Sequence, residues 1–420
     1  MAGIKITGGI PLSGEVKIQG SKNAALPMMA AALLNKGVTV LHGCPKIADV
    51  FVMEEILKKL GVKVIWEGHT LLLDAEQVTG YEVDRKLGCQ MRSSIVLLGS
   101  LLGRCGQACV PYPGGCVIGK RPVDLHLAAL EAMGAEFQEG EMLCARAGKR
   151  QESRYHFPKS SVGAAQNAIL AAVCAPGITW LSGCSKEPEV SWLCRFLNQA
   201  GARIEGVGSQ QLKITGVRNL HDTEFQVPAD RIAAGTYVCA DAITRGNCIL
   251  DQAPVEEMGA LLAAYEKIGG QYTCNSGKLI LSGQKADGFI PYLQTAVYPG
   301  FPTDLQSVFL AVLAAARGES CLVETVFEDR FKPVYQLQRM GADISVCQNC
   351  ARIRGGVLLG NKVWAEELRG GAALVLAGLA ARGETYVENR HYIERGYEDI
   401  CRVLIVFPFI FFFSLFYGFR

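Results

Sequence analysis

A short pattern repeats along this chain at intervals of 67 to 73 residues. In each copy an apolar residue is followed by glycine and a short strand-like run, as in LKKLGVKVI and LNQAGARI. The glycine fits a helix C-cap, where it adopts the left-handed conformation without steric cost. A period this long exceeds that of most solenoid repeats and predicts repeated α/β units, each with helices and several strands. The five glycines are Gly61, Gly134, Gly201, Gly269 and Gly341.

Each repeat also contains an earlier helix that is apolar on nearly all sides. Examples are NAALPMMAAALL in the first unit and LQSVFLAVLAAA in the fifth. A helix without a polar face is expected inside a domain rather than on its surface. Six such segments occur in the chain, so we expect six units of an α/β protein.

Composition excludes several classes of protein. The chain has 420 residues, half of them hydrophobic, which is enough for two or more domains with substantial cores. A net charge of +2 gives no global field for a nucleic acid or an anionic membrane. The 16 cysteines are scattered without a repeated framework, and no cationic and apolar leader opens the chain. We therefore expect a cytoplasmic protein without a nucleic-acid partner.

Cations stand where five of the six apolar helices begin. The helix macrodipole disfavours a cation at this end by a few tenths to about 1 kcal/mol. Backbone N–H groups and a neighbouring cation together suit an anion, so the pattern predicts anion sites. The alternative is that these side chains are solvated residues at the ends of the repeats. The five are Lys22, Arg92, Lys159, Arg231 and Arg369.

The fifth unit departs from this pattern, because Asp304 stands near the start of its apolar helix. A carboxylate where the equivalent residues are mostly cations suggests a general base whose proton affinity is set by neighbouring charges.

A second cluster lies in PYPGGCVIGKRPVDLHL, which predicts a loop and then a helix with Pro122 as its first residue. Cys116 stands close to Lys120 and Arg121, and adjacent cations favour a reactive thiolate. An ordinary loop cysteine is an equally good interpretation. The stretch also matches GxxxxGK of a phosphate-binding loop, but Arg121 occupies the Ser/Thr position, which argues against an NTP hydrolase.

Other cysteines give little indication of a metal site. Cys347 and Cys350 form one CxxC, with no second pair or histidines nearby to complete a zinc site.

Several strings resemble, in order, the enolpyruvyl transferases that use UDP-N-acetylglucosamine. They include GSKNAALP, PGGCVIGKRPVDLHL, PADRIAAGTY, YPGFPTDLQ and IERGYED. The resemblance implies a two-domain inside-out α/β barrel of six βαβαββ-like units, three in each domain. It places one domain at residues 22–229 and the other at residues 1–21 plus 230–402.

The resemblance also implies an activity. The enolpyruvyl group of phosphoenolpyruvate would pass to the 3-hydroxyl of UDP-N-acetylglucosamine with release of phosphate, the first committed step of peptidoglycan synthesis. No metal or organic cofactor is implied. Two alternatives stay open: the sister enzyme that uses shikimate 3-phosphate as acceptor, and a non-catalytic paralogue that only binds the nucleotide sugar.

Residue roles follow from the same resemblance. Cys116 would be the general acid and would form a covalent adduct, which implies alkylation by fosfomycin, and Asp304 would accept the proton of the sugar hydroxyl. The phosphoenolpyruvate clamps would be Lys22, Arg121 and Arg395, supported by Arg92 and Arg330. The nucleotide-sugar contacts would be Asn23, Pro122, Val123, Asp124, Leu125, Lys159, Ser161, Val162, Gly163 and Val326.

The end of the chain breaks the repeat. Residues 403–420 include the uncharged run VLIVFPFIFFFSLFYGF, where a glycine cap and a closing strand are expected near residues 407–412. Three interpretations compete: an end altered by a frameshift, a membrane anchor of marginal length, and an aberrant strand. A missing strand would leave an unpaired edge and predicts poor solubility.

Overall fold

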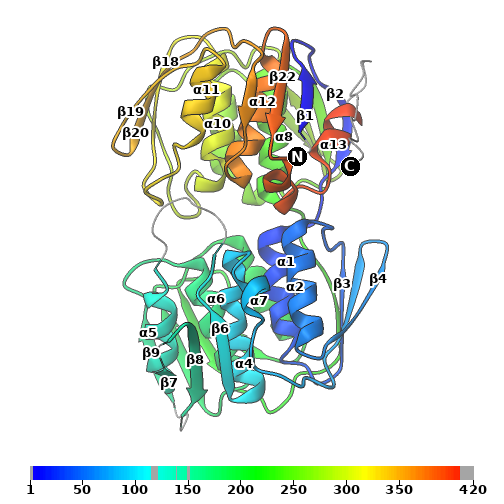
Figure 1. The fold of residues 1–420 in the computed structure, drawn as a ribbon, viewed down its shortest axis with the longest axis vertical. Coiled ribbons are helices and arrows are strands. Elements are labelled where there is room, and N and C mark those ends of the chain that lie inside the picture. Colours follow the sequence, from blue (N-terminus) through cyan, green and yellow to red (C-terminus); the bar gives the residue numbers. More distant parts are fainter. Residues whose placement is uncertain (1–2, 115–121, 139, 149–151, 407–420) are drawn as a thin grey trace. The chain divides into compact units, whose positions relative to one another are not determined.

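The computed structural model describes residues 3–114, 122–138, 140–148 and 152–406. The chain divides into two compact units (Figure 1). Of the described residues, those from Gly20 to Pro228 form the central unit, and those up to Gln19 and from Ala229 onward form the terminal unit. The described residues of each unit form three sheets and three inner helices, which confirms the predicted α/β class with six repeated units.

The six apolar segments form the inner helices. In the terminal unit α10 packs against both α8 and α12, and in the central unit α4 packs against α6. Every residue of α10 from Leu305 to Ala314 is buried, because the helix has no polar face to turn toward water. The inner helices are α1 (Lys22–Ala32), α4 (Leu97–Cys105), α6 (Val162–Val173), α8 (Arg231–Thr244), α10 (Thr303–Ala315) and α12 (Leu368–Ala380).

The central unit has sheets of order β13-β3-β5-β4, β6-β8-β7 and β11-β12-β10-β9. Its strands are β3 (Val38–His42), β4 (Lys63–Glu67), β5 (Thr70–Asp74), β6 (Gln107–Pro111), β7 (Ala135–Gln138), β8 (Met142–Ala147), β9 (Ser153–His156), β10 (Ile178–Ser182), β11 (Arg203–Glu205), β12 (Gln211–Thr215) and β13 (Thr223–Gln226). Its other helices are α2 (Ala48–Lys59), α3 (Arg85–Gly88), η1 (Arg92–Val96), α5 (Asp124–Ala132) and α7 (Pro188–Gln199).

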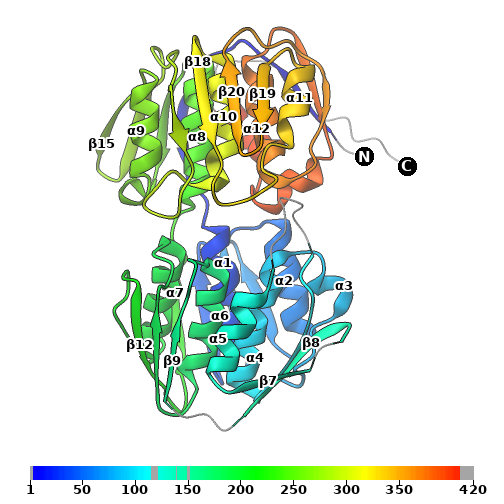
Figure 2. The same ribbon diagram turned by 90° about the vertical axis from the view of Figure 1, so that its left-hand side faces the viewer.

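The terminal unit has sheets of order β15-β16-β14-β2, β17-β18-β20-β19 and β1-β22-β21. Figure 2 shows β18, β20 and β19 of the second sheet side by side. Its strands are β1 (Ile4–Thr7), β2 (Ser13–Lys17), β14 (Asn247–Asp251), β15 (Gln271–Asn275), β16 (Lys278–Ser282), β17 (Leu293–Gln294), β18 (Glu319–Val323), β19 (Asp343–Cys347), β20 (Cys350–Arg354), β21 (Lys362–Trp364) and β22 (Glu384–Glu388). Its other helices are η2 (Val255–Glu257), α9 (Gly259–Lys267), α11 (Pro333–Arg339), η3 (Arg390–Arg395) and α13 (Ile400–Val406).

Four of the sheets share one plan, which is a parallel pair extended by an antiparallel hairpin. In one example β17 and β18 are parallel, and β20 and β19 continue the sheet in antiparallel order. The repeated glycines after α2, α5, α7, α9 and α11 all have positive φ, between 87° and 101°. The prediction that glycine is itself the C-cap is wrong by one position, because the C-cap is the preceding residue, as Leu60 is in α2. The positive φ of the following glycine explains its recurrence, because other residues rarely adopt that conformation.

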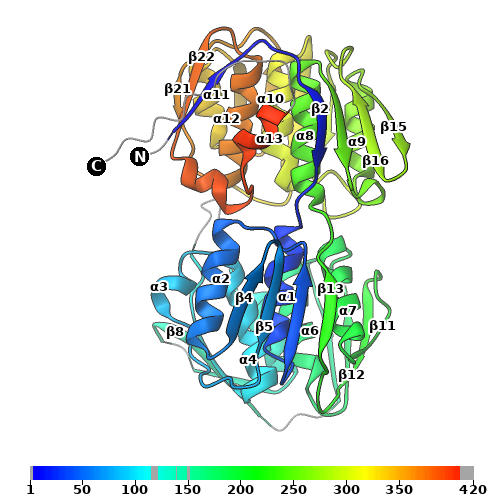
Figure 3. The ribbon, with the colours of Figure 1, turned by 90° about the vertical axis from the view of Figure 1, so that its right-hand side faces the viewer.

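The first two strands of the chain pair with strands that come much later in the sequence. β2 pairs with β14 in parallel, and β1 pairs with β22 in antiparallel order (Figure 3). In the sixth repeat β22 therefore has strand partners on both edges, β21 and β1. The strand expected near residues 407–412 lies outside the described residues. Of the tail at residues 403–420, the first four residues are described and belong to the end of α13, where Leu404 is buried. Of the helices that are described, none has the length and apolar character needed to cross a bilayer.

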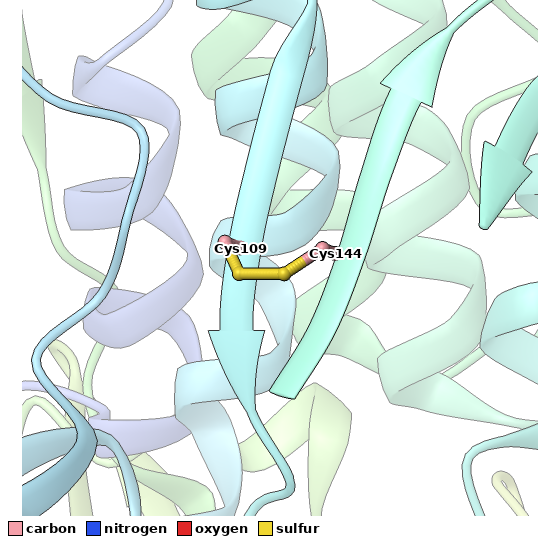
Figure 4. Close-up of a disulfide and its surroundings, with 2 residues drawn as sticks. All are labelled: Cys109 and Cys144. Carbon is pink, nitrogen blue, oxygen red and sulfur yellow. A yellow bond between two sulfur atoms is a disulfide. The ribbon is translucent and has the colours of Figure 1, made fainter. Parts of the chain in front are cut away.

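One disulfide is present in the described part of the chain. It joins Cys109 on β6 to Cys144 on β8, which face each other in the antiparallel ladder (Figure 4). A single bond among so many cysteines is not the disulfide framework of a small secreted domain.

Buried hydrogen bonds connect α8 to β14 and α9. Asp241 is fully buried and accepts hydrogen bonds from the Tyr265 hydroxyl at 2.6 Å and from the Cys248 N–H at 2.9 Å. Burial raises the pKa of the Asp241 carboxyl above its usual value, although these two hydrogen bonds act in the opposite direction.

This raised pKa predicts how stability depends on pH. A carboxyl whose folded-state pKa is raised favours folding only below its unfolded-state pKa, and that contribution is lost as pH rises through the folded-state pKa. Asp241→Asn cannot ionise, so the variant should gain stability relative to the native chain as pH rises from about 4 to about 7. Urea unfolding across this range measures the difference, and a difference independent of pH would refute the expectation.

Candidate active site

Asp304 is the second residue of α10, and its carboxylate faces two arginine side chains. Arg330 Nη2 donates to Oδ1, and Arg369 Nη2 lies 3.6 Å from Oδ2. The arginine side chains are 3% and 4% exposed, whereas that of Asp304 is 28% exposed. The two guanidinium groups stabilise the negative charge, and the exposed part of the carboxylate can meet a substrate.

Successive hydrogen bonds through Tyr397 and Thr236 hold Arg369 in place. Its Nη1 donates to the Tyr397 hydroxyl at 3.0 Å. The Thr236 hydroxyl donates to the Ile232 carbonyl at 2.9 Å, so it accepts the Tyr397 proton across 2.7 Å. Burial alone would lower the pKa of Arg369, but Tyr397 and nearby carboxylates, Asp304 among them, raise it above its usual value. Arg369 therefore remains a fixed cation beside Asp304.

Glu324, the first residue after β18, organises the segment that carries Val326 and Arg330. Its Oε1 accepts from the N–H groups of Val326 at 2.7 Å and Phe327 at 3.1 Å. Its Oε2 accepts from the Thr303 hydroxyl at 2.9 Å, and Arg330 Nε lies 3.3 Å from the same hydroxyl oxygen. Glu324 is 2% exposed, so this buried carboxylate links the segment to the start of α10.

Lys22 opens α1 in the central unit and is paired with a buried carboxylate. Its Nζ lies 2.9 Å from Asp49 Oδ2 on α2, and the two side chains are 11% and 5% exposed. An anion that approaches Lys22 would also meet the charge of Asp49, which weakens the attraction that Lys22 alone would provide.

Arg92 contacts the segment before α5. It opens η1, and its Nη2 donates to the Pro122 carbonyl at 3.1 Å. The prediction that Pro122 is the first residue of the helix is wrong by two positions. The helix begins at Asp124, because Val123 has non-helical backbone angles and acts as the N-cap.

Ser161, Val162 and Gly163 begin α6. Ser161 is the N-cap, and its hydroxyl accepts from the Ala164 N–H at 3.3 Å. Gly163 packs on His126, since a Cβ built there would lie 3.1 Å from His126 Cε1. Gly163, the second residue of α6, therefore lies against α5. The Pro122–Leu125 segment leads into α5 and forms its first turn.

The hydrogen bonds of Asn167 determine the tautomer of His126. Asn167 Oδ1 accepts from the Gly99 N–H at 2.6 Å, and its Nδ2 donates to the Ile95 carbonyl at 3.0 Å. The same Nδ2 lies 3.1 Å from His126 Nδ1, which must therefore accept. The imidazole is thus neutral with its proton on Nε2.

For the remaining predicted site residues, we give only their position in the fold and their burial. Asn23 lies on α1, Leu125 on α5, and Arg395 ends η3; all three are half-buried. Lys159 is exposed just before α6. Cys116, Lys120 and Arg121 lie outside the described residues, and so does the rejected phosphate-loop motif. No group of three or more His, Cys, Asp or Glu side chains in the described part of the chain is placed to hold a metal ion.

The expectation that the helix starts offer open N–H groups needs correction, because side chains cap four of them. Asp230 accepts from two N–H groups of α8, and Glu367 accepts from two of α12. Ser21 and Ser161 cap α1 and α6. The arginines at α8 and α12 therefore follow acidic caps that satisfy those donors, which reduces the capacity of the bare helix ends for anions.

Known proteins similar to this chain indicate its class. The family model for EPSP synthase (3-phosphoshikimate 1-carboxyvinyltransferase) matches residues 6–404. The enolpyruvyl transferase NikO from Streptomyces tendae has a similar structure, with a TM-score of 0.85 at 23% identity over 96% of each chain. EPSP synthase from Acinetobacter baumannii gives a TM-score of 0.71 at 17% identity, covering 96% of this chain and 97% of its own. The fold is that of the enolpyruvyl transferases.

Curated relatives define the family more narrowly. UDP-N-acetylglucosamine 1-carboxyvinyltransferase 2 from Caldanaerobacter subterraneus is 44% identical, covering 96% of this chain and 97% of the relative. A UDP-N-acetylglucosamine 1-carboxyvinyltransferase from Methylacidiphilum infernorum is 43% identical over 94% of each chain. The chain belongs to the UDP-N-acetylglucosamine 1-carboxyvinyltransferase family.

Proposed function

We propose that this chain transfers the enolpyruvyl group of phosphoenolpyruvate to the 3-hydroxyl of UDP-N-acetylglucosamine and releases phosphate. The supporting observation is identity of 40–44% with relatives of that name along nearly the whole chain. Two solved EPSP synthases from Acinetobacter baumannii are 17% identical to this chain, which makes shikimate 3-phosphate the weaker candidate acceptor.

The reaction requires two proton transfers. Carbon 3 of phosphoenolpyruvate gains a proton, the sugar oxygen bonds to carbon 2 and loses its proton, and the tetrahedral ketal then expels phosphate. Cys116 is our proposed acid at carbon 3 and the residue that carries an adduct or reacts with fosfomycin. Asp304 is our proposed acceptor of the sugar proton.

The surroundings of Asp304 support this role. The cations of Arg330 and Arg369 keep the carboxylate charged and able to accept a proton. The same cations weaken it as a base, so Asp304 should take the proton only as bonding to carbon 2 makes the hydroxyl acidic. Fixed arginines can also stabilise negative charge that develops in the substrate.

The proposed substrate contacts are as follows. Lys22, Arg121 and Arg395 would bind the phosphate and carboxylate of phosphoenolpyruvate, with Arg92 supporting them. The nucleotide sugar would contact Val326 and the segments around Pro122–Leu125 and Ser161–Gly163. Both substrates are small molecules, and we place the reaction in the cytoplasm, as part of cell-wall synthesis.

Phosphate release tests the activity. We expect release only when phosphoenolpyruvate and UDP-N-acetylglucosamine are both present, and little with shikimate 3-phosphate. Each substrate alone is the control, and calorimetry measures binding of the nucleotide sugar. Binding without phosphate release would identify a non-catalytic paralogue, and release with shikimate 3-phosphate instead would establish the sister activity.

A further inference from the structure

We propose that Cys321 and Cys350 form an oxidation site, at which a peroxide joins the two thiols in a disulfide. Their sulfur atoms lie 3.0 Å apart. The residues belong to β18 and β20, which are hydrogen-bonded neighbours (Figure 2). A disulfide of about 2.05 Å therefore needs the sulfurs to approach by roughly 1 Å.

The strand register explains why these sulfurs meet. Cys350 is directly opposite Val323, and Arg352 is opposite Cys321. Residues two apart on a strand share a face, so the cysteines are diagonal neighbours on one side of the sheet. Both are half-buried, and their side chains keep access to a small oxidant.

The structure also changes the interpretation of the CxxC motif. Cys347 and Cys350 are register partners at the end of the hairpin formed by β19 and β20. Within the described residues, the sulfur contact recorded for Cys350 is with Cys321 and not with Cys347. Cys321 is 29 residues away in the chain, so the sequence does not reveal this pairing.

The chemistry balances with one peroxide. One sulfur, as thiolate, attacks a peroxide oxygen, the O–O bond breaks, and a sulfenic acid and one water result. The second sulfur attacks the sulfenic sulfur and displaces its oxygen as a second water. The two sulfurs together lose two electrons, hydrogen peroxide is reduced, and the thiol protons end in water.

The bond would fasten strands that support the candidate active site. Asn349, next to Cys350, accepts from the Glu324 N–H at 2.8 Å and donates its Nδ2 hydrogen to the Glu324 carbonyl at 3.0 Å. Glu324 in turn holds the N–H groups of Val326 and Phe327. Oxidation at Cys321 and Cys350 would therefore cross-link the strand ends from which this segment begins.

Peptide mapping of the full chain tests the proposal. The reduced protein is treated with hydrogen peroxide, alkylated and digested with trypsin without reduction. Cys321 falls in the peptide of residues 318–330, and Cys347 and Cys350 share that of residues 340–352. We expect a cross-linked species of these two peptides that disappears on reduction.

Serine variants assign the sulfurs. The cross-link should persist in Cys347→Ser, the matched control, and should be lost in Cys321→Ser and Cys350→Ser. Oxidation should also lower the unfolding equilibrium constant by about 10²-fold in the native chain, since the bond closes a loop of intermediate length. A cross-link that survives Cys350→Ser, a disulfide within residues 340–352, or no cross-link would each overturn the proposal.

Discussion

Replacing Asp304 with asparagine is expected to lower kcat by about 10²–10⁴-fold, the usual contribution of a general acid or base. Asparagine keeps the size of the side chain but cannot take the proton of the sugar hydroxyl. Affinity for UDP-N-acetylglucosamine should change little, because most proposed nucleotide contacts lie on other residues. Steady-state phosphate release and calorimetric titration measure the two quantities separately.

A matched substitution controls for the general effect of removing a carboxylate. Asp343 is exposed on β19, so Asp343→Asn should leave both kcat and the affinity for UDP-N-acetylglucosamine unchanged. The unfolding midpoint of Asp304→Asn should be recorded as well, because two buried arginines lose one charged partner each, although Arg330 keeps Glu367 at 3.9 Å. Normal kcat in a folded Asp304→Asn protein would remove Asp304 as the base.

Replacing Glu324 with alanine should be the most destabilising of these substitutions. Two backbone N–H groups and the Thr303 hydroxyl, all of them partly buried, would lose their acceptor. An unsatisfied buried donor costs about 1–3 kcal/mol, and because water can replace part of what these three donors lose, a total loss of about 2–3 kcal/mol is expected. Urea unfolding measures this loss, and activity should fall too because Val326 and Arg330 lie on the released segment.

Glu319, at the other end of β18, provides the control. It pairs with Arg354, but the two side chains are 71% and 70% exposed. Exposed ion pairs contribute little, so Glu319→Ala should have no measurable effect. Equal losses in the two variants would mean that the carboxylate at Glu324 does not organise its segment.

The inner helices could be predicted from sequence because their composition requires burial. The glycine caps could be predicted because few residues accept their backbone angles. Asp304 itself was marked by its position at the start of a helix. Its structural role depends on Arg330 and Arg369, which lie 26 and 65 residues further along the chain. No local pattern reports such contacts.

Some of the site residues that the sequence analysis did not identify carry a recognisable sequence pattern, and others do not. Asp230 and Glu367 stand directly before apolar helices, which is a detectable capping signal. Sequence spacing does not reveal the roles of Asp49, Glu324 and Tyr397, because their hydrogen-bond and ion-pair partners lie on other helices and strands. The contact between Cys321 and Cys350 similarly depends on strand register.

The pairing of β1 and β2 with strands from much later in the chain affects the order in which the protein can fold during its synthesis. The described residues of the central unit all lie between Gly20 and Pro228, so this unit can fold while the ribosome is still translating the rest of the chain. Ile4 must wait for Val387, its partner in the antiparallel ladder. At roughly 5–20 residues per second, this delay lasts about 20–80 s, during which β1 presents an unpaired edge to chaperones or to other nascent chains.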